Sequence, residues 1–465
     1  MEKNYSKIEK FTGSLPVNPG LKIISYAFRI EKESFENASQ NLGSINEKFF
    51  YTGKTSERIS FTAIGSVMDV EHNGIQRVTD SSNSIQKFHS SFYNNFDDEG
   101  LTAVPLFVGG MKFSPEENDT LWEMYSDSDW FIPKYLFIEL NNEFFLITNF
   151  CVEKISPDEI LNDYKHALGK YCLNVPDTGF NEVTIVESNT DDASERERWT
   201  QQVNNALTKI RAGEFQKIVL SRQIIFRLGG VPNIYFLLKQ LEKDYPKCYV
   251  FAYKKGDSVF FGASPEKLAK VSGGWAEADA LAGSISRGNT PEEDLKLETE
   301  LLNSEKNLTE QKAVVEFIKD SFSSFSEEMI YNEKPQIRKL ANIQHLWTPI
   351  KAKLKTDSSI FSLLKDIHPT PAICGVPWTN ALVSIKKMEN HSRGLFAGMV
   401  GWFNFDNEGE FAVAIRSAIL KGDYVHAFAG CGIVEGSDPE SEFEETELKL
   451  QPILSLFKDE KIYQS

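Results

Sequence analysis

Short apolar runs separated by polar turns dominate the N-terminal part of the chain. From Leu21 to about Val186 these runs recur, and glycine- and asparagine-containing turns divide them. This pattern is typical of a mainly antiparallel sheet, because helical periodicity is weak there outside residues 157–171. The predicted strands are 23–30, 60–65, 103–108, 135–140 and 144–150, the last two joined at Asn141-Asn142. Residues 1–190 are therefore predicted to form a strand-rich N-terminal half.

The rest of the chain alternates strands with polar helices. Residues 187–197 are almost entirely polar and predict a linker or surface crossing, followed by a helix over 197–212 that ends at Gly213. The predicted strands here include 214–226, 280–288 and 411–420. A long helical pattern runs from Pro291 to about Ser321. A second acidic helix is predicted after Asp438, a favourable capping residue, and is expected to stop at Pro452.

The two acidic helices each present a carboxylate toward an apolar face. At 3.6 residues per turn, Glu442, Glu445 and Lys449 form one stripe, and Glu310 shares a face with Val314. Partly buried carboxylates need a compensating cation, and ligation by oxygen alone is the preference of Mg²⁺. The alternative is a solvated acidic face. The sequence alone leaves open whether the two helices meet.

Composition narrows the class of protein. The chain has 465 residues, of which 41% are hydrophobic, and a formal net charge of −17. This charge argues against nucleic acid or an anionic membrane as a partner. The five cysteines are widely spaced without a Cys-x-x-Cys pair, which predicts neither a disulfide framework nor a zinc site. The N-terminus carries no recognisable secretion signal and no apolar run suits a membrane span, so a cytoplasmic location is expected.

Three charged residues stand in unusually apolar surroundings. Lys217 shares a strand face with Phe215 and Val219, so it is either a strand-end lysine reaching solvent or a desolvated amine able to act as a base. Glu266 directly follows an apolar strand. Arg416 lies within the predicted strand 411–420, where it could bind a carboxylate or phosphate of a ligand, or only pair with an internal acid.

Nine motifs in a fixed order resemble the chorismate-utilising enzymes, and most closely isochorismate synthase. The motifs lie within residues 197–460, the region expected to be catalytic, and their ordered set is far more specific than any one of them. They are 216–222 (QKIVLSR), 262–266 (GASPE), 281–284 (LAGS), 304–310 (SEKNLTE), 368–372 (HPTPA), 398–401 (GMVG), 415–416 (IR), 429–434 (AGCGIV) and 443–449 (FEETELK).

The resemblance implies a single α+β domain over residues 1–465. Two large antiparallel sheets would pack face to face with helices outside, and the active site would lie in the cleft between them. The resemblance also implies Mg²⁺ dependence, with Glu310 and Glu445 as metal ligands and Glu442 in or next to the ligand shell. The residues expected to bind the substrate, chorismate, are Ala282, Gly283, Ser284, His368, Arg416, Gly430, Gly432 and Lys449.

The implied reaction moves a hydroxyl group from C4 to C2 of the chorismate ring. Water adds at C2, the ring double bonds shift, and the C4 hydroxyl leaves. Lys217 as a neutral amine would deprotonate the water, and a protonated Glu266 would donate to the leaving hydroxyl. The product would feed menaquinone or siderophore biosynthesis, and no glutaminase subunit is expected. The implied enzyme is an isomerase, expected to be a monomer.

Differences from the motifs of individual family members bear on which activity the chain has, and alternative activities remain open. Ala282 replaces the lysine that aminodeoxychorismate-forming members use as a nucleophile, and Ser284 stands where anthranilate synthase usually has threonine. Gln311 stands where the family often has histidine, and Cys431 lacks the spacing of a nucleophile elbow and is interpreted as a packing residue. Salicylate synthase is the main rival and anthranilate synthase component I a weaker one. From another class, a catalytically silent binding protein would be expected to lack one of Lys217, Glu266, Glu310 or Glu445, and all four are present.

Overall fold

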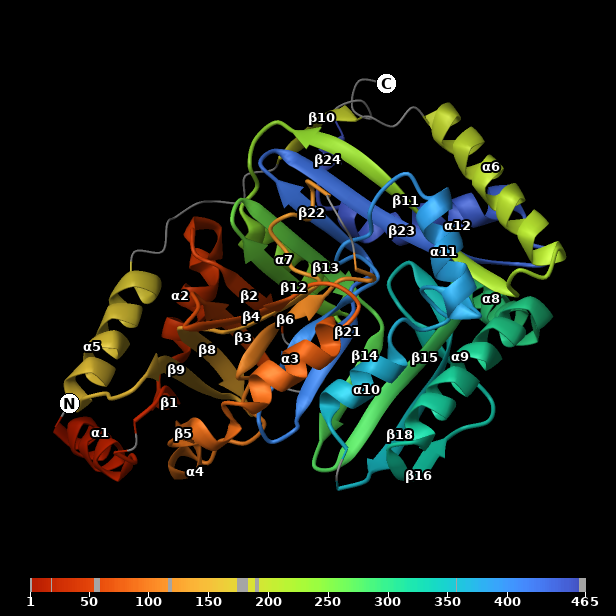
Figure 1. Ribbon diagram of the computed structural model, residues 1–465. Helices are drawn as coiled ribbons and strands as arrows, with labels where there is room; N and C mark the ends of the chain where they lie inside the picture. Colours follow the sequence, from red (N-terminus) through yellow and green to blue (C-terminus); the bar gives the residue numbers. More distant parts are fainter. Residues whose placement is uncertain are drawn as a thin grey trace.

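Two β-sheets packed face to face form the body of the molecule, as the computed structural model shows (Figure 1). The structure describes residues 2–17, 19–53, 59–115, 119–173, 183–188, 192–356 and 358–459. Among these residues every strand pair is antiparallel except β1 with β5 and β10 with β24. The fold is therefore α+β with two large, mainly antiparallel sheets, as predicted.

The larger sheet has 14 strands within the described chain. In order across the sheet they are β24 (Lys458–Asp459), β10 (Thr184–Ser188), β11 (Lys217–Leu228), β23 (Tyr424–Val434), β22 (Ser417–Lys421), β13 (Ser258–Ser264), β12 (Tyr249–Lys255), β2 (Phe49–Thr52), β3 (Ile59–Ile64), β8 (Tyr135–Leu140), β9 (Glu143–Val152), β1 (Lys22–Arg29) and β5 (Phe92–Asn94), with β19 (Gly375–Val376) paired to β11. Strand β12 pairs with β2, so strands from both halves of the chain share this sheet. A single domain remains a prediction, which this shared sheet favours.

The smaller sheet has 10 strands within the described chain. In order they are β16 (Ser326–Tyr331), β18 (Ile343–Leu354), β15 (Trp275–Ser286), β14 (Lys267–Ser272), β21 (Gly409–Val413), β20 (Met399–Phe403), β6 (Phe107–Met111), β7 (Ser128–Ile132) and β4 (Met68–His72), with β17 (Gln336–Lys339) paired to β18. Both halves of the chain again contribute, because β20 pairs with β6.

Aromatic side chains fill the space between the sheets. Phe131 on β7 stacks on Tyr253 of β12 with 5.9 Å between ring centroids, which joins the two sheets. Trp130, the neighbour of Phe131, faces the opposite side of the smaller sheet, where with none of its surface exposed it lies edge-on to Phe403 and Phe411. Such rings bury more apolar surface than any other side chains, so the packing on both faces of this sheet supplies much of the driving force for folding.

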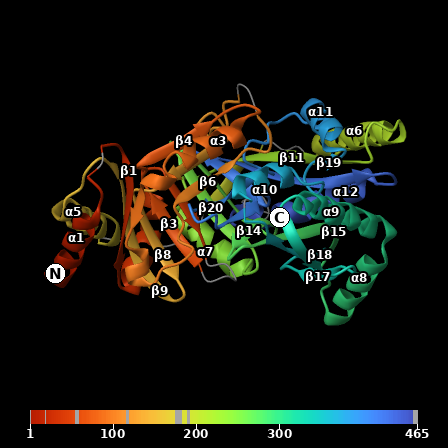
Figure 2. The same ribbon diagram turned by 60° about the horizontal axis from the view of Figure 1, so that its bottom comes forward.

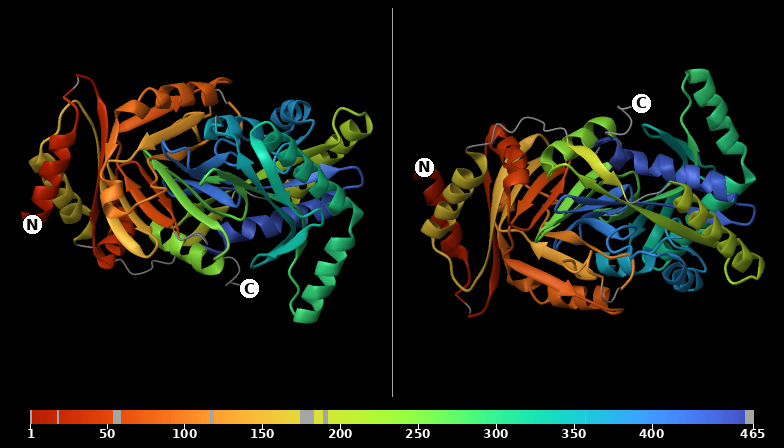
Figure 3. Two further views of the ribbon diagram at one scale, coloured as in Figure 1. Left: turned by 90° about the horizontal axis from the view of Figure 1, so that it is seen from below. Right: turned by 90° about the horizontal axis from the view of Figure 1, so that it is seen from above.

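Helices lie on the outside of both sheets (Figures 1 and 2). They are α1 (Glu2–Ser14), α2 (Lys32–Gln40), α3 (Arg77–Gln86), α4 (Phe96–Glu99), α5 (Pro157–Ala167), α6 (Asp192–Arg211), α7 (Ile234–Asp244), α8 (Pro291–Asn303), α9 (Glu305–Ser323), α10 (Ile360–Ile367), α11 (Trp378–Met388) and α12 (Pro439–Leu454), with short turns η1 (Asn41–Ser44), η2 (His89–Ser91) and η3 (Leu168–Cys172). Seen from below and above, α1 (red) and α5 lie at one end of the molecule and α8 (teal) toward the other (Figure 3). No helix of the described chain combines the length and the apolar character that a membrane crossing requires.

Most N-terminal strand predictions are confirmed. Strands β1, β3, β8 and β9 lie within a few residues of the predicted ranges, whereas β6 begins at Phe107 and not at 103. The hairpin between β8 and β9 turns at Asn141 and Asn142, whose φ angles are 54° and 65°. Asparagine tolerates this left-handed region better than most residues, which explains the turn. The predicted polar linker at 187–197 is shorter, because β10 and α6 occupy most of it in the described part.

The long acidic helix predicted from Pro291 to Ser321 is wrong, because two helices occupy this segment. Ser304 ends α8, and its side chain accepts a hydrogen bond from the Asn307 amide to cap α9. The predicted cap of α12 is confirmed, since the Asp438 side chain accepts from the Ser441 amide at 2.9 Å.

The predicted end of α12 at Pro452 is two residues too early, because the helix continues to Leu454. Proline lacks the amide that would donate to the Leu448 carbonyl. The Asn342 side chain donates to that carbonyl at 2.7 Å instead. This side-chain donor satisfies the carbonyl and accounts for the tolerated proline.

Two neighbouring crossings carry the chain between the sheets. Glu266 lies in the link from β13 to β14, and Arg416 lies in the link from β21 to β22. The crossings are hydrogen bonded to each other, since the Val413 amide donates to the Glu266 carbonyl and the Ala263 amide to the Arg416 carbonyl, both at 3.1 Å. The predicted strand 411–420 is therefore wrong: it is two strands in two sheets. Arg416 has a left-handed φ of 53° at this corner.

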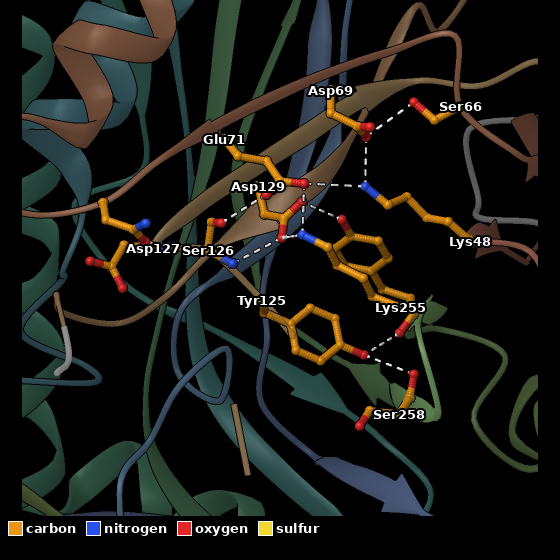
Figure 4. Close-up of polar contacts among 12 residues, drawn as sticks. Lys48, Ser66, Asp69, Glu71, Tyr125, Ser126, Asp127, Asp129, Lys255 and Ser258 are labelled. Atoms are coloured by element: carbon orange, nitrogen blue, oxygen red, sulfur yellow. Dashed lines mark hydrogen bonds and ion pairs between the residues drawn. The ribbon is translucent and has the colours of Figure 1, made fainter. Parts of the chain in front are cut away.

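A network of buried charges also joins the sheets on the N-terminal side (Figure 4). Asp129 of β7 accepts from the Tyr253 hydroxyl and from Lys255 of β12, both at 2.6 Å, and from the Ser126 amide at 2.9 Å. Lys255 also donates to Glu71 of β4 at 2.7 Å. Both oxygens of Asp129 are thus satisfied by protein donors, which is the usual condition of a buried structural carboxylate.

Candidate active site

A cleft at the junction of the two sheets encloses about 690 Å³ of space, including its mouth. Its wall contains ten of the residues predicted from the sequence: Glu266, Ala282, Gly283, Ser284, Glu310, Arg416, Gly430, Gly432, Glu445 and Lys449. They come from β15, α9, β23, α12 and the two inter-sheet crossings. Residues far apart in sequence therefore meet in one cavity. Lys217, His368 and Glu442 are outside its immediate lining.

Lys217 lies directly beside the cleft, at the first position of β11. Its side chain is 4% exposed, and its Nζ donates to Glu310 Oε1 of α9 at 2.7 Å. Gly432 of β23 makes this contact possible, because a Cβ there would lie 2.8 Å from Lys217 Cε and 2.9 Å from Glu310 Oε1. The lysine is therefore buried and not a strand-end side chain reaching solvent.

Helix α12 supplies a second carboxylate and a second amine to the wall. Lys449 Nζ pairs with Glu445 Oε1 at 2.6 Å and donates to the Gly430 carbonyl at 3.0 Å. Burial acts to raise the pKa of Glu445, but the positive charges of Lys449, Lys306 and Arg416 outweigh it and lower the pKa. Glu445 is thus held as an anion.

Glu442 lies one turn before Glu445 and is buried, with 2% of its surface exposed. It pairs with Lys306 of α9 at 2.6 Å. The two acidic helices therefore do meet, with carboxylates from both of them close to the cleft.

These carboxylates have the chemistry that Mg²⁺ requires, although their positions are those of lysine-paired groups. Glu310, Glu445 and Glu442 each contact a lysine. Over the described ranges, no three His, Cys, Asp or Glu side chains converge on a common point that could hold a metal ion. Carboxylate oxygens are nevertheless the ligands that Mg²⁺ prefers, and two of the three carboxylates line a cavity with room for water. The donor set therefore fits Mg²⁺, which Glu310, Glu445 and Glu442 would hold.

Glu266 is a buried carboxyl group that the protein leaves without a side-chain partner. It is 3% exposed, and within the described chain its side chain forms no hydrogen bond or ion pair. Burial raises its pKa to about 8, Asp279 adds to the rise, and Arg416, Lys217 and Lys449 oppose it. Glu266 therefore carries a proton at neutral pH and can act as an acid.

Arg416 is a buried cation that no carboxylate neutralises by direct contact. It is 7% exposed, and among the described residues its guanidinium forms neither a hydrogen bond nor an ion pair. Burial lowers its pKa. The alternative that Arg416 only pairs with an internal acid is therefore not supported. A buried guanidinium without a partner is suited to an anionic ligand.

His345 of β18 is a cleft residue that the sequence prediction missed. Its Nδ1 contacts the Ser284 hydroxyl at 3.0 Å and the Gly283 carbonyl at 3.3 Å. Its buried Nε2 has no partner in the described structure. Burial lowers the pKa of the ring well below its usual value, so it is neutral. The sequence signal was a single histidine in an apolar strand, which does not reveal where the side chain points.

Ser221 and Arg393 are further cleft residues that the sequence prediction missed, in the wall near β11. Ser221 lines the cleft, and its hydroxyl contacts His391 Nε2 at 3.0 Å. Arg393 also lines the cleft and donates to Glu389 and to the Val219 carbonyl. Ser221 could have been found because it shares the strand face of Lys217 by period-two alternation.

His368 lies behind the wall. Its Nε2 contacts the carbonyl of Ala397, which lines the cleft, at 3.2 Å. Burial lowers the pKa of His368 to about 4, so the ring is neutral and donates to this carbonyl. This position favours support of the wall over the substrate contact expected from the sequence, and the role of His368 stays a prediction.

Gln311, which departs from the family motif, and Cys431, interpreted from the sequence as a packing residue, are both buried. The Gln311 amide donates to the Ala280 carbonyl at 2.9 Å and to the Thr348 hydroxyl at 3.2 Å, so it links α9 to β15 and β18. Cys431 is 1% exposed, and its thiol contacts the Glu442 carbonyl at 3.6 Å. Burial raises the pKa of Cys431 well above its usual value, which disfavours the reactive thiolate.

Comparison with known proteins shows which family this chain resembles. Residues 17–458 match the family described as chorismate binding enzyme. Isochorismate synthase MenF of Bacillus subtilis is 34% identical over 448 residues, which is 94% of each chain. The salicylate biosynthesis isochorismate synthase of Pseudomonas aeruginosa is 32% identical over 84% of this chain and 81% of its own. The structure of the menaquinone-specific isochorismate synthase MenF of Escherichia coli superposes with a TM-score of 0.79 at 22% identity, over 98% of this chain and 99% of that one. The chain therefore belongs to the chorismate binding enzyme family.

Proposed function

We propose that the protein is an isochorismate synthase, which converts chorismate to isochorismate in a Mg²⁺-dependent reaction. One observation carries the proposal: a single cleft brings an unpaired buried guanidinium, Arg416, together with a buried protonated carboxyl, Glu266. The first binds an anion, and the second donates a proton to a leaving group. The similarity to isochorismate synthase MenF of Bacillus subtilis over nearly the whole chain supports the same reaction.

Chorismate carries two carboxylates, and the cleft offers two places for them. Arg416 would take the enolpyruvyl carboxylate, because its guanidinium can donate two parallel hydrogen bonds. Lys449 and the backbone amides near Gly430 and Gly432 would lie by the ring carboxylate. His345 lines the same cavity, and its Nε2, which has no partner in the described structure, would add a polar contact that orients the ring.

Glu310 and Glu445 would hold the magnesium ion, with Glu442 beside them. When bound, Mg²⁺ would offset the repulsion between these carboxylates and the ring carboxylate. Glu310 would hold the ion while lying beside the proposed base, since its Oε1 accepts from Lys217 at 2.7 Å. The cofactor assignment rests on the donor set and on the family.

The proposed acid and base act in one proton-balanced exchange. Lys217 as the neutral amine accepts a proton from water as the water oxygen bonds to C2. The ring double bonds shift, the C4–O bond breaks, and Glu266 donates its proton to the departing hydroxyl, which leaves as water. Lys217 ends protonated and Glu266 ionised, so a proton must return from Lys217 to Glu266 through solvent before the next turnover.

Incubation of the purified protein with chorismate, with and without Mg²⁺, tests the proposal. Chromatography of the products should show isochorismate only in the presence of Mg²⁺. Salicylate with pyruvate would instead identify a salicylate synthase, and anthranilate in the presence of ammonia an anthranilate synthase. Absence of turnover would favour a silent binding protein.

We further propose the biological setting from the composition and the relatives. Residues of one chain line the whole cleft, which is consistent with a monomer that needs no glutaminase subunit. The high negative charge is consistent with a protein that acts in the cytoplasm. The product would supply menaquinone or siderophore biosynthesis. Sedimentation analysis of the purified protein tests the monomer directly.

A further inference from the structure

Asp279 of β15 lies in the wall between the cleft and a neighbouring groove. It is 6% exposed and lies two residues before Leu281, which lines the cleft. Alternate residues of a strand face the same side, so Asp279 shares a strand face with Leu281, but it lies beyond the lining of the cleft. There Asp279 lines a groove of about 580 Å³ together with Arg338 and Trp347.

Two donors fix the Asp279 carboxylate in place. Trp347 Nε1 donates to Oδ1 at 2.9 Å, and the Arg338 guanidinium donates to Oδ2 at 2.8 Å. Arg338 is itself held by the Lys247 carbonyl at 3.2 Å. Donors on both oxygens stabilise the charged form, so a fixed negative charge lies behind the cleft.

Glu266 lies in the adjoining crossing and is next in sequence to this groove, because Lys267, the residue after it, lines the same groove as Asp279. Lys267 begins β14, which pairs with β15, the strand that carries Asp279. The leading positive charges that act on Glu266 are Arg416 from the second crossing, Lys217 from β11 and Lys449 from α12. The carboxylates of Glu310 and Glu445 line the same cleft, but each is paired with a lysine. The negative charge of Asp279 thus opposes three positive charges, which would otherwise favour loss of the Glu266 proton.

We propose that Asp279 is a positioning residue that keeps Glu266 in its acid form. The proposal rests on the proposed role of Glu266 as proton donor. Asp279 is not among the residues that line the cleft, so it would act through its charge. Burial and this like charge together explain why the pKa of Glu266 reaches about 8 despite three nearby cations.

Two substitutions should move the titration of Glu266 in opposite directions. Asp279→Asn removes the negative charge, so Glu266 should lose its proton at a pH lower by about half a unit or more. Arg338→Gln leaves the Asp279 charge less neutralised, so Glu266 should hold its proton to higher pH. A merely structural role would change both variants in the same way.

The measurement is infrared difference spectroscopy of the protonated carboxyl band as pH rises, assigned by its loss in Glu266→Gln. Asp279→Glu keeps the charge and should restore the wild-type titration, while Trp347→Phe removes only a hydrogen bond and should change it least. Unchanged titration in both Asp279→Asn and Arg338→Gln, or shifts of the same sign, would overturn the proposal. If Asp279→Asn does not fold, the upward shift in Arg338→Gln decides alone.

This readout separates failure of the inference from failure of the proposed function. The carboxyl band reports Glu266 without turnover. A band that titrates as expected in an enzyme that makes no isochorismate would refute the proposed reaction and leave the role of Asp279 standing. Where the protein is active, the alkaline limb of kcat/KM should move in the same direction as the band in each variant.

Discussion

Two buried charge clusters in this molecule differ in whether the protein itself satisfies them. In the N-terminal network of Figure 4, Asp129 accepts three hydrogen bonds, and Lys255 pairs with both Asp129 and Glu71. In the cleft, Arg416 has no partner in the described structure, and the Nε2 of His345 likewise has none. A buried polar group without a partner costs stability. The comparison teaches that the saturated charges of Asp129 and Lys255 hold the sheets together, whereas the cleft, in which the lysines and glutamates are paired, keeps the Arg416 guanidinium for a ligand.

The acid and the base of the cleft should show the largest effects. Lys217→Ala and Glu266→Gln should each lower kcat by about 10²-fold or more, because each removes a proton-transfer group. Steady-state assays of isochorismate formation measure this. A kcat within a few-fold of wild type for either variant would remove that residue from the chemistry.

Disrupting the N-terminal charge network should lower stability and leave catalysis unchanged. Asp129→Ala leaves Lys255 with a buried charge and should lower the free energy of unfolding by roughly 3 kcal/mol. Denaturant unfolding measures the loss. KM of the folded variant should match wild type, and a large rise in KM would contradict the division between the two clusters.

Arg416→Met should weaken substrate binding without lowering stability. Loss of the guanidinium should raise KM about tenfold or more, the usual size for a charged hydrogen bond, with a smaller effect on kcat. Stability should be unchanged or higher, because an unpaired buried charge is removed. A marked loss of stability with unaltered KM would place Arg416 in the scaffold.

Glu310→Ala should weaken the dependence of the rate on Mg²⁺. The concentration of Mg²⁺ that gives half-maximal rate should increase, since one of the two cleft-wall carboxylates is lost. Glu71→Ala is the matched control, because it removes a lysine-paired carboxylate from the saturated network. Identical metal titrations for Glu310→Ala and wild type would remove Glu310 as a ligand.

The smallest expected effect is a decline of kcat/KM at alkaline pH, caused by the titration of Glu266. Its acid form is the active one, so kcat/KM should fall as pH rises through about 8. The same raised pKa means that the stability contributed by the neutral carboxyl is present at low pH and is lost as pH rises through that value. A pH–rate profile and unfolding curves on either side of pH 8 test both consequences. Activity that stays level well above pH 8 would contradict the acid role.

The sequence predicted most of the cleft and part of the fold, and the failures have physical reasons. Periodicity located the strands, but it treated 411–420 as one strand because alternation does not show a change of sheet at Arg416. The break at Ser304 was missed because two helices in succession keep the same periodicity. His345 was missed because only packing of β18 against β15 shows which polar side chain lacks a partner.

Calorimetric titration of chorismate into the Glu266→Gln variant with Mg²⁺ tests the central claim most directly, because turnover is blocked. The unsatisfied charge at Arg416 should be what binds the substrate. Binding should therefore weaken at least about tenfold when Arg416→Met is added and stay unchanged when Asp129→Asn is added. Equal affinity with and without Arg416 would contradict the account.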